Sequence, residues 1–110
     1  MTHLLLVIAM MLGTLSLARA EAILGEWRVS NGERVVYAPC GGAFCGRVES
    51  GRYRGKSVGR MSGSGRNYTG TVTDPSTDKT YEGRAEVSGD RLVLTGCVAK
   101  VFCRSQTWTR

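Results

Sequence analysis

The sequence predicts an all-β fold, most simply a small antiparallel up-and-down β-barrel of about eight strands held by two local disulfides. From Ile23 onward, apolar residues alternate with polar ones at the period of a strand. Residues that favour turns recur at short intervals, and 15 of the 110 residues are glycine. No window of about 11 residues or more beyond position 20 shows helical periodicity. A two-sheet sandwich and a five-stranded barrel of the oligonucleotide-binding type are the alternatives.

The first 20 residues are predicted to be a secretory signal peptide. An apolar run from Leu4 to Leu17 ends at Ala18-Arg19-Ala20, the small-x-small pattern that signal peptidase recognises. The run has about 14 residues, fewer than the roughly 20 that a transmembrane helix needs. We therefore expect a single domain, residues 21–110, that is periplasmic or secreted and does not span a membrane.

The predicted strands follow one another with short turns between them. In residues 23–30, every second residue from Ile23 to Val29 shares one face, and an Asn-Gly pair at 31–32 then turns the chain. In residues 79–89, small or apolar residues alternate with charged ones, after an Asp-Pro turn at 74–75. The eight predicted strands are residues 23–30, 33–40, 44–50, 57–63, 67–74, 79–89, 91–97 and 101–110.

Four cysteines lie beyond position 20, and in an oxidising compartment they are expected to form two disulfides. If the strands meander, the turns that the two cysteine pairs flank lie at opposite ends of the barrel. Because bridged cysteines need Cα atoms within about 7 Å of each other, this geometry favours Cys40 with Cys45 and Cys97 with Cys103. A four-thiolate zinc site and a redox couple are the alternatives, and the spacing and the strand-turn context argue against them.

The chemistry open to the mature chain is limited, because the only histidine, His3, lies in the predicted signal peptide. Its loss excludes a Ser-His-Asp triad, a Cys-His pair and histidine-ligated zinc or haem. The carboxylates show no spacing typical of an acid-base pair. We therefore expect no catalytic residues, no cofactor and no metal site, and an enzyme that uses two carboxylates is the remaining catalytic alternative.

Residues 52–66, here called the basic segment, carry five basic side chains and no acidic one. Such a concentration of charge fits an anionic partner, for example lipid head groups or acidic glycans. A glycine-rich loop and edge strand kept soluble by its charges is the alternative. Because an exported protein rarely meets nucleic acid, none is expected as a partner. The basic residues are Arg52, Arg54, Lys56, Arg60 and Arg66.

The two tryptophans, Trp27 and Trp108, lie near the two ends of the predicted domain. Aromatic side chains that pack in a core are more common than those that stack on a ligand. We therefore expect both to pack where the first and last strands close the barrel.

Four segments resemble those of exported bacterial proteins grouped as domain-of-unknown-function family 2147. They are "GEWRV", "VVYAPCGGAFCGRV", "TGTVTDPSTDKTYEG" and "LTGCVAKVFCRSQTWTR", and together they span nearly the whole predicted domain. The resemblance implies a lipocalin-like (calycin) barrel. It also implies that Gly25 and Trp27 form the Gly-x-Trp motif of the first strand, and that Arg110 packs over Trp27 from the last strand. The activity of this family is not established, so no substrate or catalytic residue is carried over.

Function is expected in the barrel interior or on the basic segment. The leading hypothesis is a non-enzymatic binding module for a small apolar molecule or an envelope component. Strands this short leave less room for a cavity than those of a typical ligand-carrying barrel, although eight strands can enclose one small ligand. Moreover, only "GRYRGK" joins the third and fourth strands, where the family commonly has a longer insertion. The alternative is an electrostatic adaptor that docks the basic segment on an anionic surface or partner protein.

Overall fold

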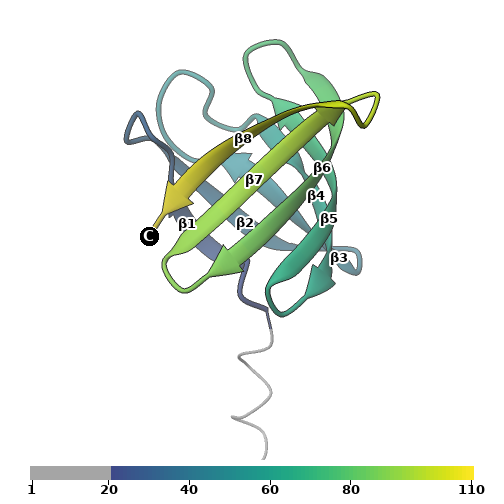
Figure 1. Ribbon diagram of the computed structural model, residues 1–110. Helices are drawn as coiled ribbons and strands as arrows, with labels where there is room; N and C mark the ends of the chain where they lie inside the picture. The colour runs from purple at the N-terminus through teal and green to yellow at the C-terminus, as the bar shows by residue number, and fades with distance from the viewer. Residues whose placement is uncertain (1–20) are drawn as a thin grey trace, which may run out of the picture.

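Eight β-strands follow one another around a closed antiparallel barrel (Figure 1). The computed structural model describes residues 21–110, so the expected signal peptide, residues 1–20, lies outside the described part. The closed ring confirms the predicted up-and-down barrel and excludes the sandwich and the five-stranded barrel. Within residues 21–110 no helix is long and apolar enough to cross a membrane. The strands are β1 (Gly25–Arg28), β2 (Arg34–Cys40), β3 (Ala43–Val48), β4 (Ser57–Ser64), β5 (Asn67–Asp74), β6 (Lys79–Ser88), β7 (Arg91–Val98) and β8 (Phe102–Thr109).

β6 shows how the alternation of the sequence builds the barrel wall. Ala85 and Val87 are buried, whereas Glu82 and Glu86 on the same strand are exposed. β6 pairs in continuous register with β5 on one side and with β7 on the other. Because successive side chains of a strand point to opposite faces, this register places the apolar set of all three strands inside.

β1 is shorter than predicted and covers residues 25–28 rather than 23–30. Ile23 is buried, but it precedes the strand in a turn where the Leu24 amide donates to the Glu21 carbonyl at 3.4 Å. At the other end, the Val29 amide donates to the Glu33 carbonyl at 2.9 Å and begins the β1–β2 turn. These local hydrogen bonds leave Arg28–Thr109 as the one register pair that joins β1 to β8 among the described residues.

The barrel has two unlike ends. The β2–β3, β4–β5 and β6–β7 turns lie at one end, together with the segment that enters the barrel at Glu21 (Figure 1, bottom). We call it the closed end. The other four connections, β1–β2, β3–β4, β5–β6 and β7–β8, surround the opposite end, which we call the mouth (Figure 1, top).

Large side chains fill the interior at the closed end. Trp27 and Met61 are fully buried, and Tyr37 and Tyr68 are 1% exposed. The Tyr68 hydroxyl donates to the Gly65 carbonyl at 2.7 Å, which fixes the ring beside the β4–β5 turn. The Tyr37 hydroxyl is buried without a hydrogen-bond partner in the described structure, and this burial raises the pKa of Tyr37. The largest fully buried side chains of the protein therefore fill this half of the barrel.

Both disulfides join neighbouring strands across one turn, as the sequence predicts. Cys40–Cys45 bridges the β2–β3 turn at the closed end, and Cys97–Cys103 bridges the β7–β8 hairpin at the mouth. Cys97 and Cys103 also face each other directly in the β7–β8 register. These two bonds hold all four cysteines of the sequence.

Removal of the mouth disulfide is expected to lower the free energy of unfolding by about 2 kcal/mol, because the bond constrains the unfolded chain over a short loop. The measurement is urea denaturation of a Cys97→Ser, Cys103→Ser variant without reductant. The Cys40→Ser, Cys45→Ser variant is the matched control, since its loop is shorter by only one residue. If the mouth variant lost less than about 0.5 kcal/mol of unfolding free energy, the expected stabilising role of this disulfide would be contradicted.

Candidate functional site

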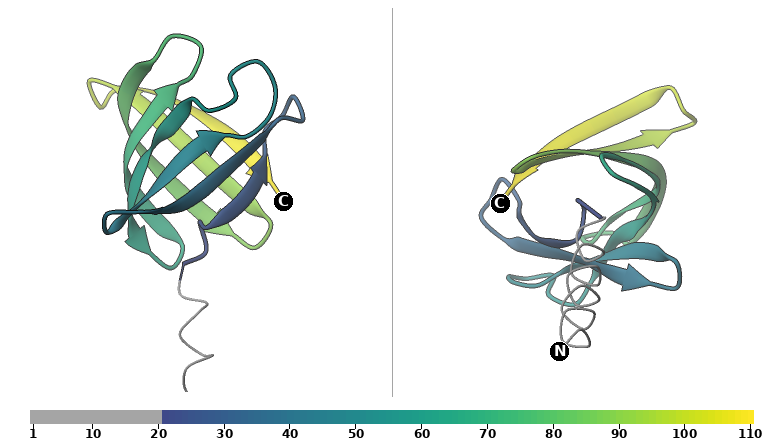
Figure 2. Two further views of the ribbon diagram at one scale, coloured as in Figure 1. Left: turned by 180° about the vertical axis from the view of Figure 1, so that it is seen from behind. Right: turned by 90° about the horizontal axis from the view of Figure 1, so that it is seen from below.

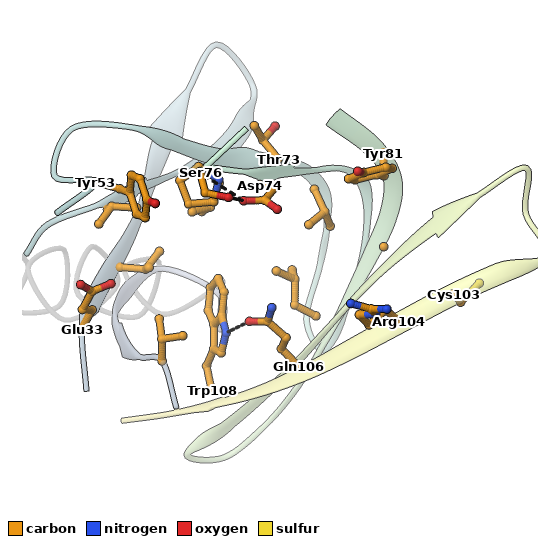
Figure 3. A pocket seen from close by; sticks show the side chains of 18 of the residues that line it. Glu33, Tyr53, Thr73, Asp74, Ser76, Tyr81, Cys103, Arg104, Gln106 and Trp108 are labelled. Carbon is orange, nitrogen blue, oxygen red and sulfur yellow. Dashed lines mark hydrogen bonds between the residues drawn. The ribbon is translucent and has the colours of Figure 1, made fainter. Parts of the chain in front are cut away.

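A pocket of about 930 Å³ opens at the mouth of the barrel. Figure 3 shows the side chains that line it. This volume lies within the range of roughly 300–1,000 Å³ of small-molecule sites. Valines form much of the apolar wall. They come from several strands around the barrel, at Val35, Val48, Val58 and Val72.

The pocket is roomier than the short strands suggested, for two reasons visible in its wall. First, Gly96 lines the pocket from β7 and fills none of it. Second, within residues 21–110 the strands β8 and β1 pair only at Thr109, so that the β7–β8 hairpin diverges from the opposite wall toward the mouth (Figure 2). A glycine without a side chain and a divergent strand together keep this half of the interior open.

Trp108 is the largest side chain of the pocket wall. It is 3% exposed, and its indole Nε1 donates to Gln106 Oε1 at 3.0 Å (Figure 3). Because strand side chains alternate, Gln106 and Arg104 share the inner face of β8 with Trp108, and both line the pocket. Trp108 is thus buried in the barrel, and its ring also faces the pocket.

Arg104 brings the one guanidinium that lines the pocket wall within residues 21–110. Its side chain is exposed, and no carboxylate lies within ion-pair distance of it in that part of the chain. An uncompensated guanidinium is a donor for a carboxylate or phosphate group. Arg104 is four residues from Trp108, so the two side chains share one face of the strand. This spacing could have predicted the position of Arg104, but the prediction from charge considered only the basic residues of 52–66.

Acidic and hydroxyl groups line another part of the rim. Asp74 Oδ1 accepts hydrogen bonds from the Ser76 hydroxyl at 2.6 Å and from the Ser76 amide at 2.9 Å. These bonds hold the pKa of Asp74 below its ordinary value of 3.8. Glu33 lines the pocket as well, from the β1–β2 turn. At neutral pH the rim therefore carries a negative charge at Asp74, on a side other than that of Arg104 (Figure 3).

The closed end holds the contact that the family resemblance implies. The Arg110 guanidinium lies over the Trp27 ring, with its central carbon 4.0 Å from the ring centroid. It also donates to the Leu24 carbonyl at 3.0 Å and to the Ala22 carbonyl at 3.1 Å. Gly25 has a φ of 110°, a backbone conformation that is strained for residues other than glycine. A Cβ at this position would lie 3.7 Å from the Arg110 guanidinium. This cluster ties the segment before β1 to the end of β8.

The basic segment does not form one surface. Arg52 and Arg54 are exposed in the β3–β4 loop at the mouth, whereas Arg66 lies in the β4–β5 turn at the closed end. Arg60 points outward from the middle of β4, where it donates to the Gly41 carbonyl at 3.2 Å. Its guanidinium is also 3.7 Å from the sulfur of Cys40. Arg60 thus covers the closed-end disulfide.

Lys56 joins two of the mouth loops. Its ammonium lies 3.0 Å from a carboxylate oxygen of Asp78, so that it links the β3–β4 loop to the β5–β6 turn. The guanidinium of Arg52 lies 5.7 Å from the centroid of the Tyr53 ring, and Tyr53 lines the pocket. The mouth part of the basic segment is therefore connected to the pocket rim.

Within residues 21–110 no group of three histidine, cysteine, aspartate or glutamate side chains is arranged to hold a metal ion. The pocket combines an apolar wall with isolated charges, an arrangement suited to binding. The expectation that the protein is not an enzyme stays a prediction.

Comparison with known proteins agrees with the resemblance seen in the sequence. Residues 25–110 match the model of a family described as "Uncharacterized protein conserved in bacteria (DUF2147)". No curated protein and no solved structure matches the chain. The family match begins at the first residue of β1 and includes all eight strands. The chain therefore belongs to the bacterial family DUF2147.

Proposed function

We propose that the protein is a binding module that holds a small, mainly apolar molecule in the barrel pocket. The observation that carries this proposal is the pocket itself, about 930 Å³ of space kept open above a filled core. Soluble barrels without a ligand role fill their interiors with side chains, because an apolar void forfeits packing energy. Here the sequence places glycine and valine where larger residues would close the space.

The arrangement of polar groups suggests how a ligand lies. Its apolar body would contact Val72, Leu94 and Trp108, which are buried or half-buried apolar residues of the pocket wall. Its polar end would remain near the mouth, where Arg104 and Gln106 offer hydrogen-bond donors. An acidic or neutral polar end suits Arg104 better than a cationic one.

The alternative function, an electrostatic adaptor that docks all five basic residues, has less support. Arg60 is engaged with the closed-end turn, Lys56 is paired with Asp78, and Arg66 lies at the end opposite Arg52. One flat partner cannot contact these side chains together. For location, we keep the proposal of an exported protein, which two disulfides support because such bonds persist in oxidising compartments.

The test is a binding measurement on the mature protein. Titration with N-phenyl-1-naphthylamine, an uncharged apolar fluorophore, is expected to saturate at one molecule per chain and to quench tryptophan emission, because Trp108 lines the pocket. A Trp108→Phe variant, which retains an aromatic ring, is expected to bind with reduced quenching. Native mass spectrometry of protein purified from its own host would then identify a retained molecule. Non-saturable uptake of the probe together with an empty native spectrum would overturn the proposal.

A further inference from the structure

The exposed apolar side chains of the protein gather at one place. Val98, Val101 and Phe102 are the large hydrophobic residues that are exposed in the described part of the chain, at 52%, 73% and 75%. All three belong to the end of the β7–β8 hairpin, here called the tip (Val98–Phe102). Single exposed apolar residues are ordinary, but a cluster on a projecting hairpin indicates a contact surface.

The tip is held in a fixed shape. Ala99 and Lys100 have φ values of 54° and 61°, a left-handed conformation that residues other than glycine adopt at a cost. The Cys97–Cys103 disulfide closes the ladder directly behind them, and the Val101 amide donates to the Val98 carbonyl at 3.2 Å. The tip therefore presents its apolar side chains outward on a backbone that is already ordered, which lowers the ordering cost of binding.

The tip stands beside the opening of the pocket. Val98, Val101 and Phe102 all contribute to the pocket lining, although they are exposed. The β7–β8 hairpin reaches out from the barrel at the mouth, as the view from below shows (Figure 2, right). A surface that contacted the tip would therefore also face the pocket opening.

Charge indicates which surface that is. Residues 91–110, which form the hairpin, include four basic residues and no acidic one. Lys100 lies on the tip itself, and Arg52 and Arg54 are exposed on another loop of the same end. Glu33 and Asp74 lie on the rim of the pocket, so they reduce the positive potential there without removing the basic charge of the hairpin. Apolar side chains flanked by basic ones favour an anionic lipid surface.

A protein partner fits this surface less well. A stable protein interface uses about 20 residues or more on each side, whereas the tip offers three apolar side chains. The outer edge of β8, from Phe102 toward Thr107, has no strand partner in the described residues, but Arg104 lies in its middle. A charge on an unpaired edge opposes pairing with the same edge of a second copy.

We propose that the mouth end docks on an anionic lipid surface, with Val98, Val101 and Phe102 inserted at the interface and Arg52, Arg54 and Lys100 against the head groups. This goes beyond the proposed pocket function, because docking does not require an occupied pocket. Docked in this way, the pocket opens toward the membrane, and an apolar ligand passes between the two without crossing water.

The test is flotation of the ligand-free mature protein with vesicles of phosphatidylcholine alone or of phosphatidylcholine and phosphatidylglycerol in equal parts. Wild-type protein is expected to float with the mixed vesicles and to be released by salt. A Val101→Ser, Phe102→Ser variant is expected to bind the mixed vesicles at least tenfold more weakly, because burial of several methylene groups is lost. A Phe102→Trp variant, which keeps the apolar tip, is expected to bind with blue-shifted emission.

Arg66→Ser is the matched charge control, since Arg66 belongs to the basic segment but lies at the closed end. Each basic residue near an anionic surface contributes about fivefold to binding, so that Arg52→Ser should weaken binding by this factor and Arg66→Ser should leave it unchanged. Equal effects of these two variants would overturn the oriented docking. The proposal would also be overturned if the wild-type protein did not float with the mixed vesicles or if the emission of Phe102→Trp did not shift. Dimers that depend on the tip and form without flotation would overturn it as well. Probe binding in the pocket is measured separately, so either proposal can fail alone.

Discussion

A Gly96→Leu variant is expected to bind the apolar probe at least about 100-fold more weakly while its fold stays intact. A Cβ built on Gly96 would lie 3.5 Å from Val72 Cβ and 3.8 Å from Tyr81 Cβ, which are ordinary contacts. The backbone there is not left-handed, so leucine is tolerated without strain. The added side chain would occupy space that the ligand needs. Probe titration measures the affinity, and urea denaturation measures the stability.

Gly83, which pairs with Gly96 across the β6–β7 ladder, provides the contrasting control. A Cβ there would collide with Val72 Cγ2 and lie 2.9 Å from the Thr95 carbonyl oxygen. Gly83→Ala is therefore expected to lower the free energy of unfolding by about 1–3 kcal/mol. Wild-type affinity in Gly96→Leu would show that the probe binds outside the pocket.

The Trp27→Ala variant is expected to lose about 3–5 kcal/mol of unfolding free energy, a large share of the stability of so small a domain. The indole is fully buried, donates to the Ile23 carbonyl at 2.9 Å and carries the Arg110 guanidinium on its face. Its removal would leave a cavity at the closed end and release Ile23 together with the segment before β1. Urea denaturation, followed by the emission of Trp108, gives the change.

Two milder variants separate the parts of this cluster. Trp27→Phe keeps an apolar ring but loses the hydrogen bond to Ile23, and it is expected to cost less than Trp27→Ala by at least about 1 kcal/mol. Arg110→Met keeps apolar contact with the ring and loses the two hydrogen bonds to Leu24 and Ala22. If Trp27→Ala and Trp27→Phe were equally stable, the closed end would not depend on filling this volume.

The strands could be predicted because each carries its own alternating pattern. In β6, the exposure of Glu82 and Glu86 and the burial of Ala85 follow directly from the sequence. The disulfides could be predicted for a related reason, since each bond closes only a few residues and needs no knowledge of distant contacts. Local information was therefore sufficient to predict the barrel and both disulfides.

The pocket and the charge distribution depend on information that is not local. Arg52 and Arg66 are 14 positions apart in sequence, yet β4 carries the chain from one end of the barrel to the other between them. Similarly, the space beside Gly96 exists because β8 diverges from β1, and the divergence follows from the early end of β1 at Arg28. Composition showed that basic residues are concentrated in one segment, but only the topology places Arg52 and Arg66 at opposite ends of the barrel.

Closure of the barrel through so few contacts between β1 and β8 also has a kinetic consequence. The Arg110–Leu24 hydrogen bond joins residues 86 positions apart, whereas every other strand pair forms between neighbours in sequence. Contacts of such high sequence separation form late, because they require the intervening chain to be ordered first. The meander from β1 to β8 is thus expected to assemble as an open, curled sheet before the ring closes between its two ends.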